Sequence, residues 1–165
     1  MIPQIKKILF ATDLSKNSVY AFYYAVHMAR KDEAKIVILH AVEPLPPMLI
    51  AFEDFVYKVA KDRWEDTVKK FKERIQDISV KVDARMGISS ADLVSRIIIR
   101  LGHPVEEILK AVDEEGCDVI VLGTHGRGFL EQTFLGSVSN SVLLRTRKPV
   151  FVVPLPSENA AVDLI

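Results

Sequence analysis

The sequence predicts an α/β fold in which a doubly wound parallel sheet of five strands carries helices on both faces. Short apolar runs rich in branched residues alternate along the chain with longer segments of helical periodicity. One of these runs, near the C-terminus, leads directly into a loop punctuated by glycine. Alternating strands and helices favour a single sheet with right-handed crossovers, and no internal repeat, low-complexity segment or domain linker interrupts the pattern.

The five predicted strands are short and mostly apolar, as expected for strands that are buried on both faces. They are Ile5–Ala11, Lys35–Val42, Leu93–Leu101, Asp118–Leu122 and Pro149–Val153. The fourth contains the unbroken apolar run 119–122 and immediately precedes the glycine loop.

Helical spacing fills most of the intervals between these strands. Ser15 is placed to cap the first helix with its hydroxyl, and Pro104 suits the first position of a later helix that Gly116 ends in a left-handed cap. Apolar residues from Phe55 to Ile78 mostly step by three or four and predict one long helix. A short helix is expected over Val138–Arg145.

The stretch from Ser79 to Asp92 is ambiguous by pattern alone. Ile78, Val80 and Val82 alternate with polar residues, as the residues of a strand do, but the stronger apolar run begins later, at Leu93. We therefore expect Ser79–Asp92 to be irregular or an inserted element.

Composition excludes several classes of protein. The 165 residues suit one domain, expected over 1–155 with a loose tail at 156–165, and the 22 basic and 22 acidic side chains cancel, which disfavours a nucleic-acid surface. The single cysteine, Cys117, rules out an intrachain disulfide and is expected to be structural. No apolar run is long enough for a bilayer span and the start does not resemble a signal peptide, so a cytoplasmic location is expected.

A glycine motif is the most informative feature of the chain. Gly123-Thr124-His125-Gly126 is followed after nine residues by Gly136-Ser137. Glycine lets backbone approach a ligand closely, and a helix N-terminus offers unpaired N–H groups with partial positive charge. The segment from Gly123 to Ser139 therefore predicts a cradle for nucleotide phosphates.

Other loops should converge on this cradle. In doubly wound sheets, ligands bind at the carboxyl ends of strands, where the strand order reverses. The loops after the first, second and fourth predicted strands begin at Thr12, Ala41 and Gly123 and should meet at that edge.

With these residues in place, the chain resembles the universal stress protein family over nearly its full length. The glycine spacing fits that of the family's nucleotide-binding members, G-x2-G-x9-G-[ST], at Gly123, Gly126, Gly136 and Ser137. Further segments that resemble the family, in order, are 7–15, 40–42, 102–108 and 148–154. The family often has proline where this chain has Ala11, which predicts a looser turn before Asp13.

The resemblance implies strand order 3-2-1-4-5, ATP (or ADP or AMP) at the carboxyl edge, and a homodimer, in the family often through the last strand, here Val150–Val153. Magnesium would arrive with the phosphates, and a regulatory protein partner of unknown identity is expected. Asp13 is expected to receive ribose hydroxyls or to place a metal–phosphate group, and the backbone of Ala41 or Val42 to recognise adenine. The full set of expected binding residues is Ala11, Thr12, Asp13, Ala41, Val42, Leu122, Gly123, His125, Gly126, Arg127, Gly136, Ser137, Val138 and Ser139.

Each of these residues also has a plain structural interpretation. Asp13 could be a turn residue bonded to its own backbone, Ser137 an ordinary helix cap, and Arg127 a solvated loop residue. His125 is expected to serve as a backbone donor or packing residue, and His40 as a core histidine with its hydrogen bonds satisfied.

Three functions remain open at this point. The first is an ATP-binding stress-response module with at most slow hydrolysis, the second a dimeric interaction module without nucleotide, and the third a slow ATPase or nucleotidyl-transfer enzyme. The sequence lacks the motifs of a Walker-type ATPase, a serine hydrolase and a dinucleotide oxidoreductase. The two H-x-x-E pairs, at His40 and His103, are weak evidence for a metal held by the protein.

Overall fold

A computed structural model describes residues 2–44, 53–124 and 135–154 of the chain, with side chains of the second helix from residue 61 onward. Its five strands form one sheet in the order β3-β2-β1-β4-β5, with every pair parallel. The strands are β1 (Lys7–Ala11), β2 (Lys35–Val42), β3 (Val94–Leu101), β4 (Val119–Gly123) and β5 (Val150–Val153). The predicted fold class and strand order are therefore confirmed.

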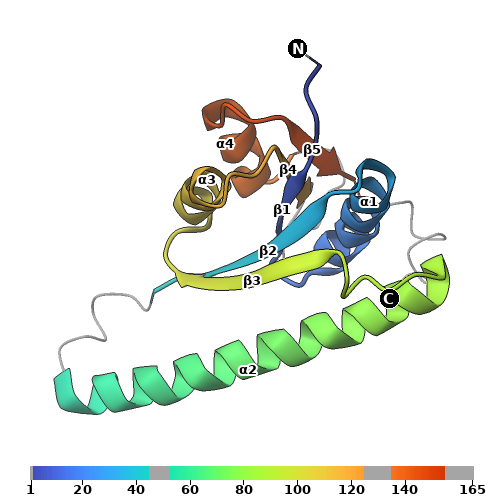
Figure 1. The fold of residues 1–165 in the computed structure, drawn as a ribbon. Helices are drawn as coiled ribbons and strands as arrows, with labels where there is room; N and C mark the ends of the chain where they lie inside the picture. Colours follow the sequence, from blue (N-terminus) through green and yellow to red (C-terminus); the bar gives the residue numbers. More distant parts are fainter. Residues whose placement is uncertain (1, 45–52, 125–134, 155–165) are drawn as a thin grey trace.

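Four helices cover the two faces of the sheet (Figure 1). They are α1 (Lys16–Asp32), α2 (Glu53–Met86), α3 (Pro104–Glu114) and α4 (Ser137–Arg145). One core lies between the sheet and α1 with α2, and a second lies between the sheet and α3 with α4. In Figure 1, α2 runs along one side of the sheet and its N-terminal part reaches beyond the strands.

Alternation along the strands explains the two cores. Ile8 and Phe10 of β1 belong to the α1 and α2 side, whereas Leu9 and Ala11 belong to the α3 and α4 side. Successive strand residues point to opposite faces, so a sheet covered on both faces needs continuous apolar runs. The central strands meet this requirement, and Ile8, Leu9 and Phe10 are almost fully buried.

The expectation of an irregular segment over Ser79–Asp92 is wrong for its first part, because α2 continues to Met86. Ile75, Ile78 and Val82 lie at helical spacing and are all buried, whereas Val80 is 63% exposed. The alternation of apolar residues at 78, 80 and 82 is therefore a coincidence on a helix. Val80 lies on the outer surface and its neighbours in the pattern face the sheet.

The helix termini follow the sequence signals with one correction. Ser15 caps α1 and its hydroxyl accepts the Ser18 N–H, and Gly116, just after α3, has a φ of +63°. The cap of α4, however, is Gly136, and Ser137 is the first helical residue, so the interpretation of Ser137 as a helix cap is wrong. None of the helices in the described ranges has the length and apolar character that crossing a bilayer requires.

Candidate functional site

A cavity of about 550 Å³ lies at the carboxyl edge of the sheet, on the side covered by α3 and α4. The ends of β1, β2 and β4 contribute to it together with the first turns of α3 and α4, as the topology predicted. Its lining consists of Ala11, Thr12, Asp13, Ser18, Leu39, His40, Ala41, Glu43, Pro104, Ile108, Leu122, Gly123, Gly136, Ser137, Val138 and Ser139.

The cavity brings together most of the residues expected to bind nucleotide. Ala11, Thr12, Asp13, Ala41, Leu122, Gly123, Gly136, Ser137, Val138 and Ser139 all line it. Val42 does not, and His125, Gly126 and Arg127 lie outside the described residues.

The loop between β1 and α1 is held by a directed chain of hydrogen bonds. The Leu14 N–H donates to Thr12 Oγ1 (3.0 Å), the Thr12 and Ser18 hydroxyls lie 2.8 Å apart, and Ser18 Oγ donates to the Ser15 carbonyl (3.0 Å). Since Ser18 has one hydroxyl proton, the Thr12 hydroxyl must donate to Ser18. The hydroxyl proton of Thr12 is therefore used in a hydrogen bond within the protein. We interpret Thr12 as a residue that shapes the site.

Leu14 shows why this loop needs such support. Its φ of 61° lies in the left-handed region, which a branched side chain enters only at a cost. The hydrogen bond from its N–H to Thr12 and the α1 cap at Ser15 hold it there. These hydrogen bonds fix the turn that follows Ala11.

Asp13 has the turn-stabilising role and also lies at the cavity. One carboxylate oxygen accepts the Ser15 N–H at 2.9 Å, which is the turn-stabilising bond of the plain interpretation. The residue nevertheless lines the cavity and is only partly buried. The turn fixes the carboxylate at the end of β1, where it can accept hydrogen bonds from a ligand's hydroxyl groups.

The backbone at the end of β2 distinguishes Ala41 from Val42. The Val42 carbonyl accepts the Gly102 N–H at 2.9 Å, on the β3 side, whereas the Leu39 carbonyl accepts the Thr12 N–H on the β1 side. Because backbone groups two residues apart point to the same edge of a strand, the amide and carbonyl of Ala41 point toward β1. β1 ends at Ala11, opposite Leu39, so Ala41 lies at the edge of the cavity rather than within a ladder on that side.

Gly123 has a packing role that differs from the one expected. A Cβ at this position would lie 2.8 Å from Asn17 Oδ1 and 3.2 Å from the backbone carbon of Asn17. The glycine therefore admits the first turn of α1, and it also lines the cavity. Asn17 is buried, and its amide donates to the Val153 carbonyl (3.2 Å) while the Thr124 hydroxyl donates to its Oδ1.

The N-terminus of α4 faces the cavity with backbone donors. The first helical hydrogen bond runs from the Asn140 N–H to the Gly136 carbonyl, and the Gly136 N–H donates to the Thr124 carbonyl at 2.7 Å. The amides of Ser137, Val138 and Ser139 precede that first bond, so the helix itself gives them no acceptor. The first turn of α4 contains no acidic residue to offset the positive end of the dipole.

Ser139 orients this helix start. Its buried hydroxyl donates to the Gly123 carbonyl at 2.7 Å, which ties α4 to the end of β4. Gly136 has φ −58° and ψ 154°, angles that any residue can adopt. The backbone angles therefore do not explain why position 136 is a glycine. The residue is buried and lines the cavity.

Several lining residues were missed by sequence reasoning. They are Ser18, Leu39, His40, Glu43, Pro104 and Ile108. Leu39 was identifiable from its alternation with Ala41, and Pro104 from its place after the third strand. His40 was assigned to the core, and its hydrogen bonding is satisfied as expected, because Nδ1 lies 2.7 Å from the Thr12 carbonyl oxygen, but it is half-buried and lines the cavity.

A second cavity lies at the opposite, amino edge of the sheet, with a volume of about 700 Å³. Three of its lining cations bond to the protein itself: Arg96 contacts Glu115 at 2.9 Å, Lys7 donates to the Glu115 carbonyl at 2.7 Å, and Lys35 donates to the Asp92 carbonyl at 2.6 Å. The two contacts with Glu115 compensate the C-terminal end of α3. The carboxyl-edge cavity, with its backbone donors, is the better candidate for a ligand site.

Metal and thiol chemistry receive no support from the described ranges. No cluster of three or more His, Cys, Asp or Glu side chains within them could hold a metal ion. Cys117 is buried, and desolvation raises the pKa of its thiol to about 11, which keeps it protonated and unreactive at neutral pH. This agrees with the structural role expected for it.

Sequence comparison adds an independent finding. The model of the universal stress protein family matches residues 4–154. Universal stress protein MJ0577 of Methanocaldococcus jannaschii is 26% identical to the chain, over 90% of this chain and 94% of that protein. A universal stress protein of Thermus aquaticus is 31% identical, over 90% of this chain and 98% of its own length.

Structural comparison points to the same fold. The solved structure of MJ0577 superposes with a TM-score of 0.67 at 26% identity, covering 94% of this chain and 100% of that one. A universal stress protein in complex with cAMP has a TM-score of 0.55 at 22% identity (92% and 98% coverage). One from Archaeoglobus fulgidus in complex with dAMP has a TM-score of 0.56 at 20% identity (93% and 99% coverage).

Proposed function

The chain belongs to the universal stress protein family, and from that premise we propose that it is a homodimeric regulatory module that binds an adenine nucleotide, ATP in the first place, in the carboxyl-edge cavity. The observation that carries the proposal is the start of α4, where three consecutive amides at a helix N-terminus line the cavity without a helical acceptor. Such a helix start attracts phosphate through both hydrogen bonds and the helix dipole.

The rest of the cavity suits the rest of the nucleotide. The backbone amide and carbonyl of Ala41 offer the donor and acceptor that an adenine edge requires, with Leu39, Ile108 and Leu122 as apolar walls. The Asp13 carboxylate suits ribose hydroxyls, because an ionised carboxylate only accepts hydrogen bonds and hydroxyls can donate. A volume of about 550 Å³ is in the range of small-ligand sites.

Magnesium fits this proposal as a companion of the phosphates. Mg²⁺ usually keeps several waters and is bound through substrate phosphates with one or two carboxylates. Asp13 is the carboxylate closest in sequence to the end of the central strand β1 and lines the cavity. Gly126 of the glycine motif and its neighbour Arg127 belong to the proposed phosphate site as well.

The likeness to the cAMP and dAMP complexes is at 20–22% identity and speaks for the fold, so the ligand assignment depends on the cavity. The polar part of the lining consists of backbone donors, hydroxyl groups, the carboxylates of Asp13 and Glu43 and the His40 ring. We propose regulation rather than turnover, because Asp13 is bonded to the Ser15 N–H and His40 to the Thr12 carbonyl oxygen. Hydrolysis, where it occurs, is expected to be slow. A cytoplasmic location and a regulatory protein partner complete the proposal.

The test is a calorimetric titration of Mg-ATP into the purified protein, into Gly136→Val and into the matched control Asn140→Val. Gly136 is buried in the lining, whereas Asn140 is exposed on the same helix and lies outside the lining. A valine at 136 should displace the phosphates from the helix start and weaken binding at least about tenfold, since charge-assisted hydrogen bonds contribute about 1.5–3 kcal/mol each.

The control should bind as the wild type does. Equal affinity in all three proteins would refute the site. An absence of binding in the wild type, together with no adenine nucleotide released when the purified protein is denatured, would favour an interaction module without nucleotide.

A further inference from the structure

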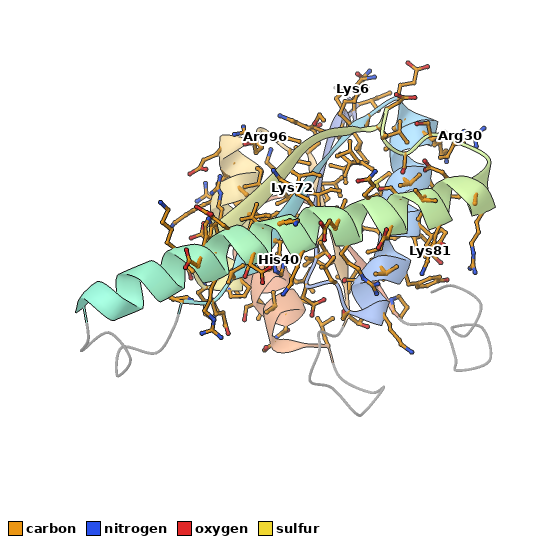
Figure 2. All side chains as sticks on the ribbon, turned by 90° about the horizontal axis from the view of Figure 1, so that it is seen from below. Lys6, Arg30, His40, Lys72, Lys81 and Arg96 are labelled. Atoms are coloured by element: carbon orange, nitrogen blue, oxygen red, sulfur yellow. The ribbon has the colours of Figure 1, made fainter. Side chains whose placement is uncertain are left out.

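His40 joins three parts of the molecule that lie far apart in the sequence. It is on β2 and lines the cavity, its Nδ1 lies 2.7 Å from the Thr12 carbonyl oxygen, and its ring stacks on Phe71 of α2. The ring centroids are 4.6 Å apart and the planes differ by 9°. Figure 2 shows His40 beside the middle of the long helix.

The contact to Thr12 has a defined direction. A carbonyl oxygen can only accept, so Nδ1 of His40 carries the proton and donates. Thr12 is the residue whose hydroxyl accepts from the strained Leu14 and donates to Ser18. His40 therefore supports the backbone of the loop that holds Asp13 at the cavity.

Phe71 occupies a special position on α2. Among the described side chains of that helix, the buried ones that face the sheet are Phe71, Ile75, Ile78 and Val82, and Phe71 is the most N-terminal. Toward the N-terminus α2 extends 18 residues further, from Glu53 to Lys70, a length of about 27 Å at the usual helical rise. Figure 1 shows this part reaching past the strands.

The ten described side chains that precede Phe71 on α2 are less buried than Phe71. From Lys61 to Lys70, every side chain is exposed or half-buried, and the ion pair between Lys70 and Asp66 lies within the helix. Among the described side chains of α2, Phe71 in the stack on His40 is therefore the most N-terminal one that is fully buried.

We propose that His40 is a positioning residue that couples the nucleotide cavity to α2. The packing of α2 against the sheet through Phe71 and the ordering of the Thr12–Ser15 loop then stabilise each other. The identity of the ligand rests on the proposed function, but the coupling itself is a property of the protein without ligand. Because coupling is reciprocal, a ligand that orders the loop must also strengthen the seating of α2. The stability of the packing of α2 against the sheet then depends on whether the cavity is occupied.

The test compares two α2 variants of similar burial. Phe71 (2% exposed) contacts His40, whereas Ile78 (5% exposed) lies two turns further along the same helix. Neither residue lines the cavity. Hydrogen exchange is measured on wild type, Phe71→Ala and Ile78→Ala without ligand, at the amides of Leu14 and Ser15, which donate to Thr12 Oγ1 and Asp13 Oδ1.

Phe71→Ala should speed exchange at these two amides at least about fivefold relative to Ile78→Ala. A factor of about five is the lower end of usual coupling strengths. His40→Phe, which keeps a ring for stacking but has no donor for Thr12, should speed exchange at the same amides and leave α2 protected. Equal exchange of the loop in the two α2 variants, or an unchanged loop in His40→Phe, would overturn the proposal.

The nucleotide supplies a second readout. Saturating Mg-ATP should slow exchange of α2 amides around Phe71 in the wild type and should not do so in His40→Phe. Phe71→Ala should bind Mg-ATP at least about fivefold more weakly than Ile78→Ala. If ATP binds tightly but leaves α2 unchanged, the coupling is refuted; if ATP does not bind at all, the proposed function fails and exchange without ligand decides the coupling.

Discussion

A single hydroxyl group, that of Thr12, organises the loop that ends β1. It accepts from the Leu14 N–H and donates to the Ser18 hydroxyl, and Thr12 as a residue is only 7% exposed. Thr12→Val keeps the shape of the side chain but leaves the Leu14 N–H without its acceptor. Removal of one partner from a buried hydrogen bond costs about 1–3 kcal/mol.

We therefore expect Thr12→Val to lower the free energy of unfolding by that amount and Thr12→Ser to change it much less. Equilibrium denaturation in urea measures both variants. A Thr12→Val protein as stable as the wild type would show that the loop does not depend on this hydroxyl.

At the scale of elements, α2 shows what the sequence could and could not predict. Its helical period was readable up to Ile78, but beyond it Val80 and Val82 fit a strand as well as a helix. Only the sheet decides between them, because it buries Ile78 and Val82 and leaves Val80 63% exposed. The choice between helix and strand depends on contacts with the sheet, and the local sequence pattern carries no information on those contacts.

This assignment makes a direct prediction. In a strand, residues 78, 80 and 82 would share one face and truncation at each would cost stability. In the helix, Ile78→Ala should cost about 2–5 kcal/mol, whereas Val80→Ala should stay within about 0.5 kcal/mol of the wild type. Thermal and urea unfolding of the two variants checks the prediction, and a large loss from Val80→Ala would contradict a helix through this region.

An ion pair connects α3 to α4 next to the site. Arg145 Nη1 lies 2.6 Å from Glu106 Oε1, and this hydrogen bond lowers the pKa of the Glu106 carboxyl, with His103 and Lys110 contributing smaller electrostatic effects. Since the pKa of Glu106 in the folded protein lies below its value in the unfolded chain, the pair stabilises the fold at pH values above the unfolded pKa. This stabilisation is lost as the pH falls through the folded pKa.

NMR titration of the Glu106 side chain should therefore give a pKa below the ordinary value, and Arg145→Met should raise it. The pair is exposed on both sides, so little change in stability is expected. An unchanged Glu106 pKa in Arg145→Met would mean that the pair does not persist in solution.

For the whole molecule, the sheet and most of the cavity lining could be predicted because both depend on simple periodicities. Alternating strands and helices fix a parallel sheet, and its carboxyl edge must gather the loops after β1, β2 and β4. The role of Gly123 could not be predicted, since the contact with Asn17 joins residues 106 positions apart in the chain. The stack of His40 on Phe71 was missed for the same reason.

The proposed dimer involves the edge strand β5 of the sheet. β5 is an outer strand of the sheet, and its Phe151 is 40% exposed and packs on Tyr24, which is 38% exposed. If two chains pair along β5, Phe151→Glu should place a charge in the interface and yield monomers. Val80→Glu adds the same charge on α2 and should leave the dimer intact. Sedimentation equilibrium distinguishes the outcomes, and a wild-type monomer, or a Phe151→Glu dimer, would contradict pairing through β5.

The proposed adenine nucleotide binds between the carboxyl ends of β1 and β2 and the start of α4. The most direct measurement follows the backbone amide NMR signals of the intact chain during titration with Mg-ATP. We expect saturable shifts at the cavity residues Asp13, Ala41, Ser137, Val138 and Ser139. No shifts are expected at Lys35, Arg96 and Glu115, around the cavity on the opposite edge. Shifts confined to that opposite edge, or no shifts at any nucleotide concentration, would contradict the proposed site.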